Sequence, residues 1–351
     1  MTLTIVNTLE EKTWREFVYH HPQGNIFHTP EMFQVFSGAK GYKPNLWGVV
    51  DESKHPLALL LPVQVSLQKG LFYHWTTRAV AYGSLLCATG FERNEELKSL
   101  LQTYCHMMRG RILFTELRNL SNLSNLQPVL NTCSYTYEDH MNYLIDLNQS
   151  EEALWHNIDR TGRKYVRAST NHGTVVEQVT SREQFTIAYQ ILQNTYNRIH
   201  VPIPHISLFE SAYKILSPKK MFHIFLAYAE GNYIGTKFIL SYKGKIIAWY
   251  GGSDRAFNSH RPNEYLTWYV LQWSKRQGYH EFDFGGAGKP NEVYGPRDFK
   301  AKFGGKLVNF GRNTCIHSPR RLQISKNVYS WLRKVSFFRS PHLRKQDSIE
   351  Y

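Results

Sequence analysis

Several features are scarce or missing in this sequence, and each absence excludes a class of protein. The 351 residues include only four cysteines, widely and irregularly spaced and without a CxxC pair: Cys87, Cys105, Cys133 and Cys315. Such spacing fits neither a zinc site nor a disulfide-rich framework, so we expect reduced thiols in a cytoplasm. The apolar run "LALLLPVQV" is too short to cross a bilayer and contains Pro62. The first residues lack the basic and apolar regions of a signal peptide. We therefore expect a soluble, cytoplasmic protein.

Familiar catalytic and cofactor motifs are missing as well. The pair Gly288-Lys289 has Asp283 where the first glycine of a Walker loop should stand, and nothing reads GxGxxG or GxSxG. Sixteen histidines suggest metal binding, but the closest pairs have no metal-ligand spacing: His20 with His21, and His200 with His205. We expect no metal, no tightly bound cofactor and no nucleophilic serine or cysteine.

Acidic residues are outnumbered by basic ones, 28 against 42, which gives a formal net charge of +14. This charge favours an anionic partner such as RNA, a phosphate-bearing substrate or an anionic membrane surface, although a merely basic soluble enzyme would also fit. The composition, with 42% hydrophobic and 20% charged residues, is that of a globular protein. The length suffices for two domains, each with its own core.

Hydrophobic periodicity and turn residues predict one α/β unit repeated twice. Helices are expected over residues 10–21, 30–40, 94–108, 150–169, 182–198, 207–216 and 263–278. Strands are expected over residues 44–50, 56–67, 111–117, 221–230, 233–242, 246–254 and 280–286. Each half has strands, then a helix, then one more strand. The predicted fold class is therefore α/β, an α+β sheet with flanking helices in two tandem domains. The expected parts are an N-terminal domain over 1–147, a catalytic domain over 148–317 and a basic helix and tail over 318–351.

The stretch "FDFGGAGKPNEVYGPRDFKAKFGG", residues 282–305, combines a strand end with a glycine-rich loop and lysines. Glycines leave backbone N–H groups free to approach a ligand, and Gly285 and Gly286 are the candidates here. Lys300 and Lys302 have the form to meet negative charge that develops on a carbonyl oxygen. A solvated basic loop, with glycines that serve turns, is the alternative interpretation.

This stretch, with "TGRKYVRAS" upstream and "YGGSDRAF" between, resembles the Fem family of peptidoglycan bridge-forming aminoacyltransferases and their GNAT-type relatives. The resemblance covers essentially the whole chain, and the pair "FDFGG" and "FKAKFGG" is its specific part. It implies two GNAT-like domains in tandem. It also implies that Lys300, in the Phe299-Lys300 pair, stabilises the tetrahedral intermediate. Phe299 and Tyr294 are then expected among the substrate-binding residues, and Lys302 is expected to be catalytic together with Lys300.

A second basic cluster has the spacing i, i+3, i+4, i+7, which places its members on one helix face: Arg160, Arg163, Lys164 and Arg167. Like charges so placed repel one another unless an anion answers them, so a phosphate-rich ligand and a solvated face are both open interpretations. Arg198 stands where the Fem pattern has an arginine that holds a nucleotide- or lipid-linked substrate. It could equally pair with its own helix C-terminus.

The donor and the general base are less well specified. Acetyl-CoA-dependent GNAT domains have a glycine-rich pyrophosphate loop after the strand meander, whereas this interval reads "SDRAFNSHRPNEYL". The departure favours aminoacyl-tRNA over acyl-CoA as donor, yet the chain lacks the long helical arm of some Fem members. Asp254, Glu264 and His260 are the candidate bases, with Asp254 preferred. The C-terminal helix is expected to pack on the first domain, or to rest on the inner face of the cell membrane.

The predicted activity is amide formation in the second domain. The favoured reaction transfers an aminoacyl group from aminoacyl-tRNA to an amine of a lipid- or nucleotide-linked cell-wall precursor. An acyl-CoA-dependent N-acyltransferase that acts on an amino sugar or another amine is the first alternative. A non-catalytic RNA-binding protein with a transferase fold is the second.

Overall fold

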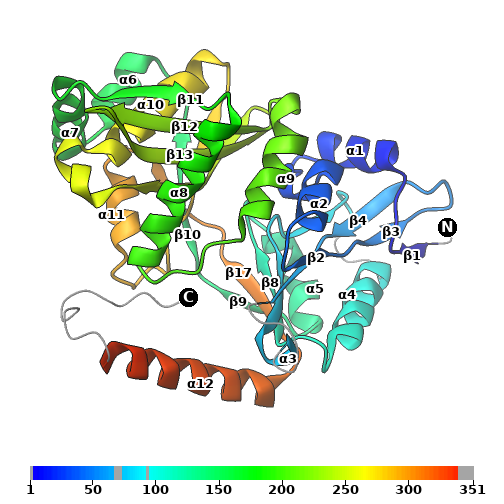
Figure 1. The fold of residues 1–351 in the computed structure, drawn as a ribbon. Helices are drawn as coiled ribbons and strands as arrows, with labels where there is room; N and C mark the ends of the chain where they lie inside the picture. The colour runs from blue at the N-terminus through cyan, green and yellow to red at the C-terminus, as the bar shows by residue number, and fades with distance from the viewer. Residues whose placement is uncertain (1–2, 67–72, 92–94, 339–351) are drawn as a thin grey trace. The chain divides into compact units, whose positions relative to one another are not determined.

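The computed structural model describes residues 3–66, 73–91 and 95–338 (Figure 1). The chain divides into two compact units. Unit 1 comprises residues 1–140 together with 310–351, and unit 2 comprises residues 141–309. The sequence predicts the first boundary at 147/148 and assigns 310–317 to the second domain. The first limit moves to 140/141 because residues 141–146 form a strand in the sheet of unit 2. The second moves to 309/310 because residues 312–316 form a strand in a sheet of unit 1.

Unit 2, described throughout, contains a seven-stranded sheet in the order β11-β12-β13-β14-β15-β10-β16. Its strands are β10 (Met141–Asp146), β11 (Val175–Gln178), β12 (Phe222–Ala229), β13 (Asn232–Tyr242), β14 (Lys245–Ser253), β15 (Glu281–Gly286) and β16 (Lys306–Asn309). Neighbouring strands are antiparallel except β14 and β15, which are parallel and joined by a helix. The predicted meander of three strands, a helix and a further strand is confirmed.

The helices of unit 2 cover both faces of this sheet (Figure 1). They are α6 (Glu151–Asn157), α7 (Arg160–Asn171), α8 (Arg182–Arg198), α9 (Ile206–Leu216), α10 (Pro262–Arg276) and α11 (Gly295–Ala301). Successive side chains of a strand point to opposite faces. Accordingly Phe225 packs its ring 5.1 Å from Trp273 of α10. Phe222 instead packs 5.8 Å from Phe238, whose ring lies 5.3 Å from Phe209 of α9. This two-sided burial explains why β12 is apolar along nearly its whole length.

Unit 1 repeats the same plan with shorter, split strands. Its strands are β1 (Thr4–Val6), β2 (Tyr42–Pro44), β3 (Trp47–Val50), β4 (Pro56–Leu60), β5 (Val63–Ser66), β6 (Thr77–Ala81), β7 (Leu85–Cys87), β8 (Phe114–Arg118), β9 (Thr136–Glu138) and β17 (Arg312–Ile316). Its helices are α1 (Glu11–His20), α2 (Pro30–Ser37), α3 (Tyr73–Thr76), α4 (Glu95–Met108), α5 (Gln127–Thr132) and α12 (Pro319–Phe338). The parallel pair β6 and β8, joined by α4, corresponds to β14 and β15 joined by α10.

In each unit one strand is inserted into the sheet out of its order in the sequence. In unit 2, β10 lies between β15 and β16, although it precedes every other strand of that sheet in the chain. In unit 1, β17 lies between β8 and β9, although the chain reaches it only after unit 2. Because β17 pairs with two strands of unit 1, residues 310–317 belong to unit 1.

Two expected elements differ in detail, and a third is as expected. The helix predicted over 150–169 is two helices, because Asp159 accepts a hydrogen bond from the Gly162 N–H and thereby caps a new helix. The strand predicted over 56–67 is broken before Pro62, since proline cannot donate to a ladder. The first turns of α12 do pack on unit 1, where Ser325 Oγ donates to the Trp75 carbonyl at 2.8 Å. Residues 67, 94 and 339–351 of the predicted elements lie outside the described residues.

The turn after α11 requires a glycine for two separate reasons, and a matched pair of variants can distinguish them. Gly304 has a φ of +72°, and a Cβ there would lie 2.1 Å from the Asn157 carbonyl oxygen. Gly278 has a φ of +82° but faces open space. We expect Gly278→Ala to cost about 1–2 kcal/mol of unfolding free energy, the price of a left-handed alanine. Gly304→Ala should cost about 2 kcal/mol more, because backbone must move. Urea unfolding of both variants measures this; equal costs would contradict the close contact.

Candidate acyl-transfer site

The parallel ladder between β14 and β15 is short, and its end defines the site. Only three residue pairs join the two strands, from Lys245 with Glu281 to Ile247 with Asp283. Beyond them β14 continues to Ser253 on the ladder of β13, and β15 continues to Gly286 on the ladder of β10. Beyond this point the backbone N–H and C=O groups on the facing edges of the two strands no longer hydrogen-bond each other. Such groups need other partners. A ligand that enters between the strands can supply them.

Lys300 is fixed at this strand end by backbone carbonyls. Its Nζ donates to the Gly286 oxygen at 2.6 Å and to the Gly285 oxygen at 3.3 Å. The lysine reaches them from α11, which follows the glycine-rich loop. Gly285 has a φ of +72°, a left-handed conformation that favours glycine. Burial lowers the pKa of Lys300 to about 8, so the group is still mainly protonated at pH 7. Two of its three N–H groups are engaged, which leaves one for a ligand.

Asp283 holds the same loop from beneath. Its carboxylate accepts hydrogen bonds from the Gly285 N–H at 2.7 Å and from the Asn142 amide at 3.2 Å. The side chain is buried, and burial raises its pKa to about 6 although the hydrogen bonds and Lys300 oppose the shift. At neutral pH the carboxylate is therefore ionised for most of the time and favours the charge on Lys300.

Lys237 of β13 is a second buried cation in this region, and sequence reasoning missed it. Its Nζ donates to Thr267 Oγ1 at 2.6 Å and lies 5.8 Å from the ring centroid of Phe284. Burial, reinforced by the charge of Lys300, lowers the pKa of Lys237 to about 7. The available signal was a lone lysine inside the apolar strand "YIGTKFILSY". The structure thus combines a lysine that stays charged with one that is able to accept a proton near neutral pH.

Two further cations surround the ring of Tyr165 on α7. The Arg261 guanidinium lies 4.0 Å from its centroid, and Lys302 Nζ lies 5.2 Å away. Glu264, in the first turn of α10, is buried nearby, and burial raises its pKa against the influence of Lys302 and Arg261. Lys302 also lies 5.9 Å from the ring of Phe299. These contacts place Lys302, Phe299 and Glu264 together, as the sequence predicts for Lys302 and Phe299.

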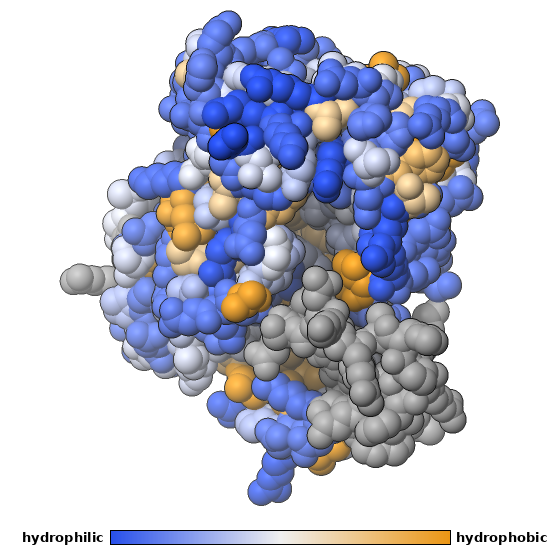
Figure 2. All heavy atoms as spheres, turned by 90° about the vertical axis from the view of Figure 1, so that its left-hand side faces the viewer, coloured by the Kyte–Doolittle hydropathy of each residue, from blue (hydrophilic) through white to orange (hydrophobic). Residues whose placement is uncertain are grey.

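The predicted basic cluster does lie on one helix, α7, but its members differ in what they contact. Arg163 donates to the carbonyls of His156 and Ile158, at 2.8 and 2.5 Å, and so supports the turn from α6. Arg160 and Lys164 are exposed, with no ion-pair partner among the described residues. The face of unit 2 that carries α7 is predominantly hydrophilic, with apolar side chains in small separate patches (Figure 2). Arg163 therefore has a structural role, whereas Arg160 and Lys164 remain available to an anion.

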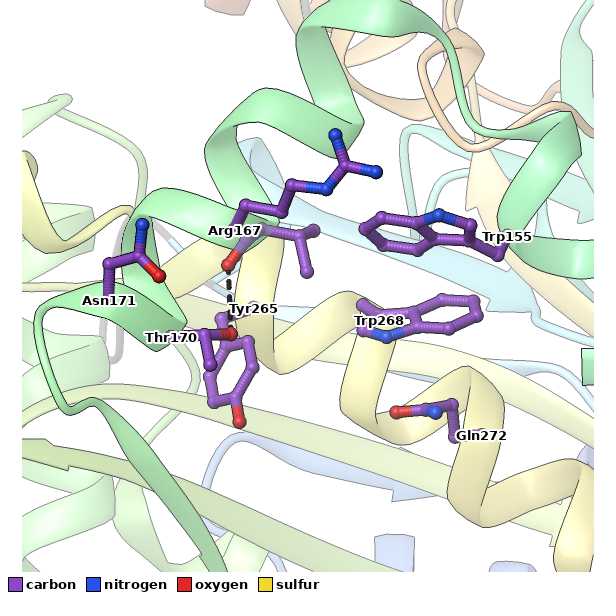
Figure 3. Close-up of a pocket in the computed structure, with 8 residues that line it drawn as sticks. Trp155, Arg167, Thr170, Asn171, Tyr265, Trp268 and Gln272 are labelled. Carbon is purple, nitrogen blue, oxygen red and sulfur yellow. Dashed lines mark hydrogen bonds between the residues drawn. The ribbon is translucent and has the colours of Figure 1, made fainter. Parts of the chain in front are cut away.

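Arg167 borders a pocket of about 340 Å³ between α6, α7 and α10 (Figure 3). The pocket is lined by Trp155, Val166, Arg167, Thr170, Asn171, Tyr265, Trp268 and Gln272. The two indole rings lie 5.1 Å apart at 55°, and the guanidinium of Arg167 lies 5.4 Å from the ring centroid of Trp155. Figure 3 shows these indoles as one wall of the pocket, with the hydroxyl of Tyr265 and the amide of Asn171 toward the other side. A flat aromatic wall beside a cation suits a planar ring that carries phosphate.

The remaining predicted residues occupy other positions. Asp254 is exposed and caps the 3₁₀ helix η5 (Arg255–His260) by accepting from the Ala256 N–H at 2.9 Å, which gives it a structural task. His260 is buried, with Nε2 3.1 Å from a Glu230 carboxylate oxygen. Arg198 is exposed at the last position of α8. Tyr294 precedes α11, and its ring lies close to the position that a Cβ on Gly288 would take. Of the candidate bases, Glu264 is the one whose charge acts on the buried Lys237.

Comparison with known proteins relates this site to a known domain and fold. Residues 156–301 match the family model of the GNAT acetyltransferase domain. The solved structure of FemX has a TM-score of 0.68 and 15% identity, and the match covers 90% of this chain and 97% of that one. A tandem GNAT protein from the clavulanic acid biosynthesis pathway has a TM-score of 0.60 and 11% identity over 90% of this chain and 99% of that one.

The chain has the Fem-type tandem GNAT fold. The lysylphosphatidylglycerol synthetase of Bacillus licheniformis is similar too, with a TM-score of 0.57, 13% identity and coverage of 91% of this chain and 97% of that one. A search of curated protein sequences gives no significant match. The predicted resemblance and fold class are confirmed, and the GNAT domain that spans Lys237 and Lys300 supports an acyltransferase. Along the residues that the structure describes, no helix has the length and apolar composition of a membrane span.

The candidate site can be tested through the titration of Lys237. A lysine in an unfolded chain keeps its proton up to about pH 10.4, whereas Lys237 loses it near pH 7 in the folded state. Between these values the unfolded state binds more protons, so the unfolding free energy should rise with pH. Lys237→Met should flatten that rise between pH 7 and 10, and Lys306→Met, on the exposed end of β16, should leave it unchanged. Urea unfolding at a series of pH values measures both; an unaltered slope in Lys237→Met would contradict the buried environment.

Proposed function

We propose that unit 2 transfers an aminoacyl group from aminoacyl-tRNA to an amine of a peptidoglycan precursor. The amine nitrogen attacks the ester carbonyl, and a C–N bond forms. The C–O bond to the tRNA ribose then breaks, the ribose oxygen leaves, and the proton of the amine is passed to a base and on to that oxygen. The observation that carries the proposal is Lys300, a charged lysine fixed by two glycine carbonyls where β14 and β15 part.

Lys300 suits the stabilisation of the tetrahedral intermediate. The ammonium is already held by Gly285 and Gly286, so it does not have to reorganise when charge develops on the carbonyl oxygen. Burial strengthens its interaction with that charge because the local dielectric is low. Lys237, whose pKa is about 7, is suited to accept the proton of the attacking amine. The amine needs such help, since a free primary amine has a pKa of roughly 10.4.

The donor is inferred from the surface around α7. Arg160, Lys164 and Arg167 form a row of cations along the helix, and the indoles of Trp155 and Trp268 stand beside it. Single-stranded nucleic acid is bound by this combination, in which cations follow the backbone and bases stack on aromatic rings. The acceptor end of a tRNA is such a strand. FemX and the lysylphosphatidylglycerol synthetase, which share the fold, are compatible with a cell-envelope acceptor and a cytoplasmic site at the membrane surface.

An acyl-CoA donor is the second candidate, and one observation favours it. The family model that matches residues 156–301 is described as an acetyltransferase, and the tandem GNAT protein of clavulanic acid biosynthesis was solved without acetyl-CoA. The interval between β14 and α10 has no glycine-rich loop, however, and its cation Arg261 already stacks on Tyr165. A pyrophosphate would therefore have to be held by side chains.

Replacement of Lys300 tests the chemistry. In Lys300→Met the intermediate loses its cation, and we expect the rate of transfer to fall by about 10²–10³-fold, as for the loss of one oxyanion donor. The melting temperature should fall, because Gly285 and Gly286 lose the donor to their carbonyls and Asp283 loses a nearby cation, so the rate is measured well below that temperature. Lys306→Met removes the same charge from an exposed position and should retain full activity. Transfer of radiolabelled aminoacyl groups to a muropeptide measures the rate; retained activity in Lys300→Met would contradict the proposed role.

The donor is tested by matched triple variants. Arg160→Gln/Lys164→Gln/Arg167→Gln removes the cations of α7, and Arg182→Gln/Lys214→Gln/Lys306→Gln removes three exposed charges elsewhere in unit 2. Both lower the net charge equally. We expect the α7 variant to bind charged tRNA at least about tenfold more weakly, with a shallower salt dependence, and the control to bind almost normally.

Filter binding with charged tRNA, alongside melting temperatures with tRNA and with CoA, provides the measurement. A ligand of the folded state raises the melting temperature by mass action. Stabilisation by CoA without any by tRNA would replace the proposed donor with acyl-CoA. Equal loss of tRNA binding in both triple variants would show that only the overall charge matters.

A further inference from the structure

Two cysteines and a histidine that lie far apart in the sequence meet inside unit 1. Cys105 is on α4, Cys315 is on β17, and His317 directly follows β17. The two sulfurs are 3.4 Å apart, although 210 residues separate them in the chain. Sγ of Cys315 lies 3.9 Å from Nδ1 of His317, and all three ligand atoms lie within 4.8 Å of one another. All three residues are buried.

The Cys105–Cys315 and Cys315–His317 separations are close to the edges of a tetrahedral zinc site. With Zn–S bonds of about 2.3 Å and Zn–N bonds of about 2.0 Å, two sulfurs lie about 3.8 Å apart, and a sulfur and a nitrogen about 3.6 Å apart. A disulfide would need its sulfurs about 2.0 Å apart. Movements of a few tenths of an ångström therefore bring Cys105 and Cys315 to zinc, whereas a disulfide needs more than an ångström.

The groups around the three ligands prepare them for a metal. Nε2 of His317 lies 2.8 Å from the hydroxyl of Thr115, which is fully buried. When Nε2–H donates to that oxygen, the lone pair of Nδ1 faces Cys315, the arrangement that orients ligating histidines in metal sites.

Tyr135 supplies an independent observation. Its side chain is 2% exposed, and its hydroxyl makes no hydrogen bond of ordinary geometry with the described residues. The hydroxyl faces the Cys105 thiol, with which it interacts. A buried hydroxyl that lacks a good hydrogen bond costs about 1–3 kcal/mol, so a further ligand at this place would be favourable. Tyr135 is placed to complete a fourth position, directly or through a water.

We propose that Cys105, Cys315 and His317 bind one structural Zn²⁺ ion in unit 1. Zinc binding replaces the thiol protons: two S–H bonds break, two Zn–S bonds form, and two protons are released to solvent. Two thiolates and Zn²⁺ are together neutral, which suits a core of apolar side chains. A monovalent ion such as Cu⁺ would leave a net negative charge there.

The site would secure the strand that unit 1 takes from the far end of the chain. β17 is inserted between β8 and β9, and zinc would link its last residues to α4 on the face of the sheet. Sequence spacing predicts no metal site because that interpretation relies on ligands close together in the chain. Here the fold, rather than the spacing, brings them together. Neither the site nor its test depends on the transferase activity of unit 2.

Zinc content of the full-length protein is the first test. The chain is produced with zinc in the medium, purified without strong chelators and assayed by mass spectrometry of the metal. We expect about one zinc per chain, falling at least about tenfold in Cys105→Ser and Cys315→Ser. Cys87→Ser is the matched control, because Cys87 is also buried but lies outside the cluster. It should retain about one zinc per chain, with native circular dichroism as the check on folding.

A second measurement decides the matter if the cysteine variants do not fold. The wild-type protein, stripped of metal and loaded with Co²⁺, should show the near-ultraviolet charge-transfer band of a cobalt–thiolate bond, and Zn²⁺ should remove it. A wild-type zinc content below about 0.1 per chain with no such band would overturn the proposal. Zinc retained in both variants would also overturn it, as would equal loss in Cys87→Ser. A thiol count that finds only Cys87 and Cys133 free would do the same, by revealing a disulfide.

Discussion

The end of the ladder between β14 and β15 is the constraint on which the site of unit 2 depends. A parallel pair that continued to the strand ends would satisfy its own backbone groups and leave no entry for a ligand. Here pairing ends after Ile247 and Asp283, and each strand continues on its other neighbour alone. The carbonyls of Gly285 and Gly286 are then free to accept from Lys300. The proposed catalytic cation is thus held at the place where the ladder between the two strands ends.

Four buried or partly buried ionisable groups gather at this opening, and their charges balance. Lys237 and Lys300 are cationic when protonated, and Asp283 and Glu264 are anionic when ionised. An isolated buried charge would be very costly, but opposite charges close together offset part of that cost. The remaining cost appears as pKa values near neutrality, about 7, 8 and 6 for Lys237, Lys300 and Asp283. Such values are unfavourable for stability and favourable for proton transfer, which is why they cluster at functional sites.

Local signals predicted most of unit 2, and long-range contacts account for what they missed. The bounds of α8, residues 182–198, follow from the sequence because Ser181 and Gln184 form a capping box before an apolar repeat. The break before α7 was missed although Asp159 is a good cap, since the periodicity continues through it. Lys300 came from a resemblance in its motif. Lys237 was missed, because a lone lysine in a strand does not show which groups it faces.

The same reasoning explains why Asp254 was a poor candidate for the base. A polar residue directly after a strand can either contact a ligand or cap the helix that follows, and aspartate is favoured in both roles. The sequence cannot separate them where the following helix is a short 3₁₀ turn. The structure shows the cap satisfied, with the carboxylate on the Ala256 N–H. Cys105 and Cys315 illustrate the converse case, in which nothing local indicates a site and the topology of β17 alone creates one.

Comparison of the two units supports the proposal that the chemistry belongs to unit 2. In unit 1 the parallel pair β6 and β8 also has three residue pairs, and Glu116 of β8 is buried at that place. Burial alone would raise the pKa of Glu116, but Arg118 and Arg312 lower it to about 2. The Arg312 guanidinium lies 3.4 Å from the Glu116 carboxylate, and Arg118 pairs with it as well. The charges of these two arginines are neutralised by the Glu116 carboxylate. Lys300 instead donates to neutral carbonyls, so its positive charge is able to interact with an anion that forms during the reaction. Among the described residues, the cations at this place in unit 1 are paired with Glu116, whereas Lys300 of unit 2 is held by backbone carbonyls.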